Sequence, residues 1–313
     1  EELNNCSKYK SKSRFYTNDN SKKIPKGAVI FPKRGAAIMN NKVRISTCEI
    51  YLDSNMMALQ ANALLHNEYL YYSLIREKLH KIADTSTIPQ INNKHINPYI
   101  LLLPPLKEQI NIAQILSTWD QAIETIKKLL ANSQQQKKAL MQQLLTGKKR
   151  FIGFGGIWKQ TKLQVIANVV MGSSPKSETY NSEGNGLLLI QGNADIKNRR
   201  SAPKVFTSQI TKECKVQDIL LSVRAPVGAI AKSLHHACIG RGICAIAAKK
   251  NVNQEFLYQW MLSFEPRWKS FSQGSTFESI NSDDIKLLHI YLPANEEEQQ
   301  KIASVLSIAD DDI

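Results

Sequence analysis

The sequence predicts a mixed α+β protein in which two α/β globular units follow one another, separated by long helices that form an antiparallel coiled coil. Three observations support this fold class. An internal repeat runs through the chain, a heptad pattern occupies residues 104–147, and strand-like runs alternate with polar turns in residues 158–293. Each copy of the repeat is long enough to bury a core of its own.

The repeat covers both globular units and the start of each helix. The matched blocks are GAVIFPKRGAAI (27–38) with QDILLSVRAPVGAI (217–230), NEYLYYSL (67–74) with QEFLYQWM (254–261), TIPQIN (87–92) with TFESIN (276–281), and LPPLKEQINIAQILS (103–117) with LPANEEEQQKIASVLS (292–307). The blocks keep their order and only loop lengths differ. We therefore expect a tandem duplication whose first copy lacks its opening segment and whose second copy lacks most of its helix.

A long helix is expected over residues 104–147. Pro104 and Pro105 suit its entry, because proline costs little at the first helical position, and Gly147 suits its C-cap. Between them seam positions recur every three or four residues, apolar except for Ser133 and Lys137, which is typical of a coiled coil rather than of a helix lying on a globular core. The predicted seam consists of Ile112, Leu116, Trp119, Ile123, Ile126, Leu130, Leu140 and Leu144 in this helix and Ile302, Leu306 and Ala309 in the second. We expect the two helices to pair within the chain; an intermolecular dimer zipper is the alternative.

The domain boundaries follow from the repeat. We expect a first globular domain over 1–103 with its start missing, the helix over 104–147, a linker over 148–157, a second globular domain over 158–293, and the start of a truncated helix over 294–313. In the second domain the expected strands include GLLLIQG (186–192), DILLSV (218–223), ICAIAA (243–248) and LLHIYL (287–292). No apolar run is long enough to cross a bilayer, and the polar N-terminus has no signal-peptide core, so we expect a cytoplasmic protein with no membrane partner.

The charge balance points to a polyanionic partner. The chain has 41 Lys and Arg residues against 27 Asp and Glu residues, a formal net charge of +14, and nucleic acid is the usual partner of such an excess. Many basic residues lie in or beside predicted turns, where they can neutralise phosphates or read base edges. For any single one of them a solvated surface position is an equally good interpretation. The candidate DNA-binding residues are Lys33, Arg34, Arg44, Lys94, Arg199, Arg200, Arg224, Arg241, Gln273, Ser275 and Thr276.

Motifs for chemistry on this chain are weak. The run 151–155 matches the F-x-G-x-G loop that grips S-adenosylmethionine, but its glycines follow a helix end rather than a strand. The stretch 235–244 contains two histidines and two cysteines that suit zinc, yet alternating strand residues explain the spacing better and the first copy has no counterpart. We therefore predict no catalytic residue, no metal and no cofactor on this chain.

The helical regions resemble a known family. LPPLKEQINIAQILSTWDQAI (103–123) and KKALMQQLLTGKKRF (137–151) resemble the central conserved region of the specificity subunits of type I restriction-modification systems, and LPANEEEQQKIASVLS resembles the start of their distal conserved region. Three further blocks resemble recurrent parts of their target-recognition domains, namely WKQTKL (158–163), DILLSVRAPVG (218–228) and QGSTFESIN (273–281). The resemblance covers essentially the whole chain.

The resemblance implies a function. It implies two target-recognition domains that each read half of a bipartite site in double-stranded DNA. It also implies two modification subunits as partners, which carry the adenine-N6 methylation chemistry with S-adenosylmethionine. Whether translocating restriction subunits also take part stays open, as do two alternatives: a stand-alone DNA methyltransferase, and a coiled-coil scaffold that does not read sequence.

Overall fold

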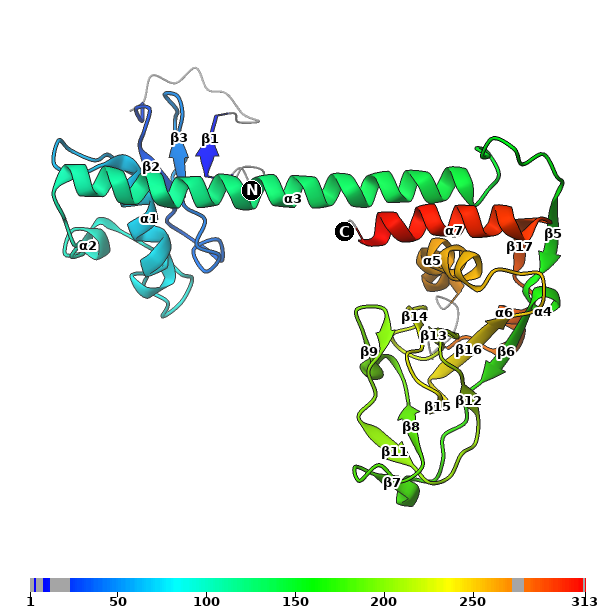
Figure 1. The fold of residues 1–313 in the computed structure, drawn as a ribbon. Helices are drawn as coiled ribbons and strands as arrows, with labels where there is room; N and C mark the ends of the chain where they lie inside the picture. The colour runs from blue at the N-terminus through cyan, green and yellow to red at the C-terminus, as the bar shows by residue number, and fades with distance from the viewer. Residues whose placement is uncertain (1–2, 4–7, 12–22, 272–278, 312) are drawn as a thin grey trace. The chain divides into compact units, whose positions relative to one another are not determined.

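The computed structural model describes residues 3, 8–11, 23–271, 279–311 and 313 (Figure 1). The chain divides into two compact units, residues 1–127 and 128–313, and both mix helix with sheet as the sequence predicts. The long helix α3 (Leu106–Leu144) begins in the first unit and ends in the second. It is a single helix of 39 residues, which confirms the helix expected within 104–147.

The first unit is built on a four-stranded sheet with the order β1-β3-β2-β4. Its elements are β1 (Tyr9–Lys10), β2 (Val29–Pro32), β3 (Arg44–Ser46), β4 (Met56–Leu59), α1 (Asn67–Glu77), the 3-10 turn η1 (Leu79–Lys81) and α2 (Asn93–Ile96). The central strand β2 is buried throughout, as its run of apolar, partly β-branched residues requires. Leu70 and Leu74 of α1 share one core with Val29 and Phe31 of this strand.

The second unit contains two larger sheets and one strand pair. The sheets have the orders β6-β16-β13-β14-β10-β9 and β12-β15-β8-β11-β7, and β17 pairs with β5. The strands are β5 (Trp158–Lys162), β6 (Ala167–Met171), β7 (Tyr180–Asn181), β8 (Leu187–Ile190), β9 (Ile196–Lys197), β10 (Arg200–Ser201), β11 (Val205–Thr207), β12 (Glu213–Cys214), β13 (Ile219–Ser222), β14 (Ile230–Lys232), β15 (Ala237–Ile239), β16 (Ile243–Ala248) and β17 (His289–Pro293). The helices are α4 (Leu163–Ile166), α5 (Gln254–Phe271), α6 (Ser282–Lys286) and α7 (Glu296–Asp311), with 3-10 turns η2 (Ser177–Thr179) and η3 (Asn193–Asp195). The four strand-like runs predicted in this unit are all strands.

The two units share one sheet topology, which confirms the duplication at the level of the backbone. The order β1-β3-β2-β4 of the first unit reappears in the second as β10-β14-β13-β16. In each case the first pair is parallel and the next two pairs are antiparallel. The turns repeat as well, because Arg34 forms an isolated bridge with Gln90 and Arg224 forms one with Ser279. The internal repeat of the sequence pairs the same positions.

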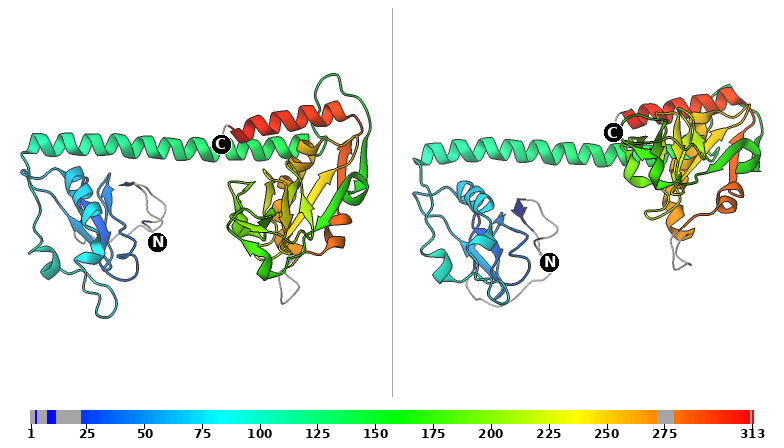
Figure 2. Two further views of the ribbon diagram at one scale, coloured as in Figure 1. Left: turned by 60° about the horizontal axis from the view of Figure 1, so that its bottom comes forward. Right: turned by 90° about the horizontal axis from the view of Figure 1, so that it is seen from below.

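Helix α7 packs against the last turns of α3 within the second unit, and Figure 2 shows the two helices side by side in both views. They run antiparallel, because Lys137 of α3 meets Asp310 near the end of α7, whereas Arg150, beyond the end of α3, meets Glu298 near its start. The seam residues Leu140 and Leu144 pack in the same core as Ile302 and Leu306, and Ala309 is half-buried. The expected antiparallel pairing within the chain is present over these turns.

The seam positions nearer the start of α3 have a different environment. Ile112 is half-buried, and the next five seam residues are exposed: Leu116, Trp119, Ile123, Ile126 and Leu130. The start of α3 contacts its own unit through another face, where Gln109 and Ala113 are buried. For these five residues a place in a helix–helix seam stays a prediction.

Candidate nucleic-acid interface

A pocket of about 330 Å³ opens in the second unit where segments from its two large sheets converge. It brings together two of the predicted DNA-binding arginines, Arg224 from the turn after β13 and Arg241 from the turn between β15 and β16. The remaining lining residues come from the segment after β6, the start of β7 and the segment after β8: Ser174, Tyr180, Gln191, Gly192 and Asn193, with Ala225 and Gly242 beside the arginines.

The segments that line the pocket are held together by closely approaching backbones. A Cβ placed on Gly172 would lie 2.2 Å from the Gly240 carbonyl oxygen, and one on Gly242 would lie 2.4 Å from that of Gln191. Only glycine allows such an approach. A 2.8 Å hydrogen bond from the Gly240 N–H to the Ile190 carbonyl ties the same segments together. Strand pairing therefore fixes the shape of the pocket.

Several polar groups of the lining serve to hold its walls. The Tyr180 hydroxyl donates to the Pro175 carbonyl at 3.2 Å, and the Ser174 hydroxyl accepts from the Arg241 N–H at 3.3 Å. The backbone N–H of Gln191 donates to the Asp195 carboxylate at 2.7 Å. These bonds use the backbone of Arg241 and Gln191 and leave their side chains available to a ligand.

The electrostatics of the pocket favour a ligand rich in hydrogen-bond acceptors. Its lining carries two guanidinium groups and no carboxylate. Arg224 and Arg241 are both exposed, and within the described part of the chain neither side chain forms an ion pair. Because a guanidinium only donates, the pocket suits a phosphate or the acceptor edge of a base.

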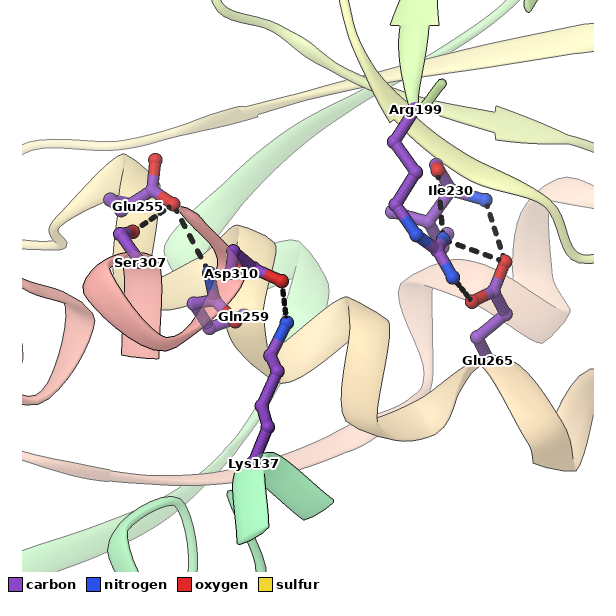
Figure 3. Close-up of polar contacts among 8 residues, drawn as sticks. All are labelled: Lys137, Arg199, Ile230, Glu255, Gln259, Glu265, Ser307 and Asp310. Carbon is purple, nitrogen blue, oxygen red and sulfur yellow. Dashed lines mark hydrogen bonds and ion pairs between the residues drawn. The ribbon is translucent and has the colours of Figure 1, made fainter. Parts of the chain in front are cut away.

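Two other predicted DNA-binding arginines are bound to their own unit. Figure 3 shows Arg199 against Glu265 of α5, with its guanidinium 2.8 Å from the carboxylate and a further 3.2 Å bond to the Ile230 carbonyl. Burial lowers the pKa of Arg199, but the hydrogen bond to Glu265 and the negative charge of that carboxylate together outweigh it, and the net shift is upward. Arg44 donates to the carbonyls of Val43 and Leu3, at 2.7 and 3.0 Å. Both side chains stabilise the fold; whether they also meet DNA stays a prediction.

The remaining candidates are dispersed over the two units. Lys33 is half-buried and Arg34 exposed after β2, Lys94 is exposed in α2, and Arg200 is exposed on β10. Gln273, Ser275 and Thr276 lie outside the described residues. The sequence patterns did not single out Gln191, Asn193, Ser174 or Tyr180. For Gln191 and Asn193 a signal was available, because polar residues follow directly after the buried run LLLI (187–190).

Helices α3, α5 and α7 are joined by a polar network, drawn in Figure 3. Asp310 of α7 pairs with Lys137 of α3 and accepts a 2.9 Å hydrogen bond from Gln259 of α5. Ser307 of α7 also donates to Glu255 of α5 at 2.9 Å. Three helices from distant parts of the sequence are thereby tied to one another.

A second ion pair fastens the linker to α7. Arg150 donates to both carboxylate oxygens of Glu298, at 2.8 and 2.7 Å, and to the Gly156 carbonyl at 2.7 Å. Glu298 is only 1% exposed, so its charge is compensated almost entirely by this bidentate partner. The hydrogen bond to Glu298 raises the pKa of Arg150.

The zinc-like stretch 235–244 has other partners in the structure. His235 is hydrogen-bonded to Ser201 at 2.9 Å, and His236 pairs with Glu213 at 2.5 Å. Burial raises the pKa of the Cys244 thiol to about 12. No three His, Cys, Asp or Glu side chains of the described residues are grouped as metal ligands would be.

None of the helices in the described residues combines the length and apolar character that a membrane crossing needs.

Curated proteins similar to this chain are specificity subunits. The putative type I restriction enzyme MjaX specificity subunit of Methanocaldococcus jannaschii is 34% identical over 278 residues, which cover 82% of this chain and 64% of that protein. The type I restriction enzyme MjaIX specificity subunit of the same organism is 31% identical over 166 residues, 49% of this chain and 38% of that protein. The chain thus spans less than two thirds of the length of these relatives.

Solved structures resemble the fold over nearly its whole length. A chain from a structural study of complex assembly and conformational transition of the type I R-M system has a TM-score of 0.60 at 26% identity, covering 94% of this chain and 77% of that one. The HsdS subunit from Thermoanaerobacter tengcongensis has a TM-score of 0.50 at 25% identity, covering 92% and 74%. The type I restriction-modification S subunit from M. genitalium shares the fold with a TM-score of 0.62 at 15% identity, covering 97% and 82%.

The family model agrees with the duplication seen in the sheets. The model of the type I restriction modification DNA specificity domain matches residues 1–132 and again residues 156–313. Each match contains one copy of the shared sheet and the beginning of the helix that follows it. The chain therefore belongs to the type I restriction modification DNA specificity domain family.

Proposed function

We propose that this chain is the DNA-recognition subunit of a type I restriction-modification complex. Residues 1–103 and 158–293 act as two target-recognition domains, each reading half of a bipartite site in double-stranded DNA. One observation carries the proposal: the same four-stranded sheet occurs twice, and each copy presents an exposed arginine at the same bridge position, Arg34 and Arg224. Two domains with the same sheet and different loops suit a DNA site made of two different halves.

The pocket in the second domain supports a role in binding DNA. Its two arginines meet no carboxylate in the lining, and the chain as a whole has a formal net charge of +14. Such a surface attracts the phosphate backbone and releases its counterions, which makes the affinity depend on salt. The amide side chains beside the arginines add groups that distinguish bases.

The chemical steps belong, in this proposal, to partner subunits. The relatives are specificity subunits of restriction enzymes, and one structural neighbour comes from work on the assembly of a type I R-M complex. We assign adenine-N6 methylation with S-adenosylmethionine to two modification subunits, and translocation with cleavage to restriction subunits where these join. The chain itself is a non-catalytic reader without a cofactor of its own, and it acts in the cytoplasm, where the chromosome lies.

The methylome of a host strain tests this function. The chain is expressed alone, with the modification subunit from its own genome, and that subunit is also expressed alone. The proposal predicts methylated adenines in one bipartite motif only when both are present. Methylation by the chain alone would instead identify a stand-alone methyltransferase, and methylation without a motif would identify a scaffold that does not read sequence.

A further inference from the structure

One exposed arginine occupies the same position in both units. Arg34 and Arg224 are equivalent: each follows the buried central strand of its sheet, and each forms an isolated bridge, to Gln90 and Ser279 respectively. Both side chains are exposed. A residue that recurs at one backbone position in two domains with different loops suits a task that does not depend on those loops. Contact with the phosphate backbone is such a task, because phosphates are identical at every step of the duplex.

Arg241 has no basic counterpart in the first unit. The Lys33 N–H donates to the Asn55 carbonyl at 2.8 Å, and in the second unit the equivalent bond joins the Val223 N–H to the Gly242 carbonyl at 2.9 Å. Gly242 therefore corresponds to Asn55, and the preceding residue, Arg241, corresponds to Ser54. This arginine is a feature of the second domain alone.

The surroundings of Arg241 suit the reading of a base. It shares the pocket with the amide side chains of Gln191 and Asn193, which both donate and accept. Its backbone is fixed on both sides, because Gly240 and Gly242 pack against Gln191 so closely that an added Cβ would lie 3.2 and 2.4 Å from it. Its N–H is also bonded to Ser174. An arginine that starts from a fixed backbone presents its guanidinium to the same part of the pocket in every molecule, which an arginine on a mobile loop does not.

We propose a division of labour within this interface. Arg34 and Arg224 contact phosphates at equivalent places in the two domains, whereas Arg241, with Gln191 and Asn193 beside it, reads a guanine edge in the half-site of residues 158–293. Guanine fits because it presents two adjacent acceptors, O6 and N7, to the two parallel donors of a guanidinium in the major groove. This inference rests on the proposed function, since it assigns roles within the same DNA interface.

Selection from a library of randomised DNA duplexes tests the assignment. The full chain, in complex with its modification subunit, is used as wild type and as the variants Arg241→Ala, Arg241→Lys, Arg224→Ala and Arg34→Ala. Lys250→Ala serves as a matched control, because Lys250 is exposed in the same unit and lies outside the pocket. Each complex gives an enriched motif and a salt dependence of binding, and thermal melting verifies that each variant is folded.

Arg241→Ala is expected to lose one G·C position of one half-site, with discrimination reduced about 5- to 150-fold there and all other positions kept. Arg241→Lys is expected to lose the same position although it keeps the charge, because the Lys ammonium lacks the two parallel N–H donors of a guanidinium. Arg224→Ala and Arg34→Ala are expected to keep every position while the slope of log K against log salt falls by about 1. The control keeps both motif and slope.

The outcomes separate this inference from the function on which it rests. A wild-type motif that survives both Arg241 variants unchanged overturns the assignment of Arg241 and leaves the recognition function standing. Loss of a single base position in Arg224→Ala, with its salt slope unchanged, overturns the phosphate assignment. A wild-type complex that enriches no motif contradicts the proposed function, and the inference with it.

Discussion

Gln109 and Gln299 make the same three hydrogen bonds in the two units. Each side chain is fully buried. Its oxygen accepts from the backbone N–H of the residue just before α1 or α5, and its nitrogen donates to two carbonyls. The partners of Gln109 are His66, Leu64 and Pro104, at 2.8, 2.9 and 2.8 Å. The partners of Gln299 are Asn253, Asn251 and Pro293, at 2.8, 3.5 and 2.9 Å. In both units, therefore, one glutamine fastens the first turn of the following helix to the globular domain.

Replacing this glutamine should loosen the junction between the second domain and α7. Gln299→Leu keeps the approximate size of the side chain but leaves backbone groups of Asn253 and Pro293 buried without partners. Each such group costs about 1–3 kcal/mol, so unfolding in denaturant should begin at a clearly lower concentration. Gln300→Leu is the matched control, because this neighbouring glutamine is exposed and its loss should change stability by less than about 0.5 kcal/mol. Equal stability of the two variants would contradict the role of Gln299.

The pair formed by Lys137 and Asp310 should set the antiparallel packing of α3 and α7. Lys137 is 12% exposed and Asp310 36%, so the interaction is partly screened and should be worth on the order of 1 kcal/mol. Lys137→Asp and Asp310→Lys should each destabilise the second unit, and the double exchange should recover part of the loss. A double-mutant cycle measured by denaturant unfolding gives the coupling. Strictly additive effects would show that the two side chains do not interact.

The first unit should lose stability in acid through Glu68. Burial raises the pKa of this carboxyl, but the hydrogen bonds from Tyr9 and Lys8 together with the positive charge of Lys8 outweigh it, so the pKa lies below its ordinary value. Because the folded pKa is lower than the unfolded one, the stabilisation is fully present above the unfolded pKa of about 4.3 and disappears as pH falls through the folded value.

Hydrogen exchange of the α1 amides between neutral and acidic pH measures this effect. Wild-type protection should decrease on acidification more steeply than that of Glu68→Gln, which has no carboxylate to protonate. Glu108→Gln, at an exposed position in the first turn of α3, is the control and should follow the wild-type profile. If Glu68→Gln also follows that profile, Glu68 does not couple the first unit to pH.

Much of the architecture could be predicted because it is encoded locally or twice. The heptad pattern repeats over so many turns of α3 that no single residue decides it, and the duplicated blocks pair Arg34 with Arg224 by sequence alone. The same blocks pair Gln109 with Gln299. Neither residue stands out in one copy alone, since a glutamine in a first helical turn is usually solvated.

The pocket could not be predicted from the sequence, because it depends on contacts between distant segments. The close approach of Gly172 to Gly240 and of Gly242 to Gln191 arises from the way two sheets meet. The pairing of Arg199 with Glu265 likewise joins residues 66 positions apart. Several strands, such as β9 and β10, have only two residues, which is too short for a periodic signal.

The central claim, that two separate domains each read one half of a DNA site, is tested most directly by exchanging one of them. Residues 158–293 are replaced by the corresponding domain of another family member, and the methylome is recorded in a host that also expresses the modification subunit. The account predicts a bipartite motif in which one half changes and the other half is retained. A motif that changes in both halves, or in neither, would contradict it.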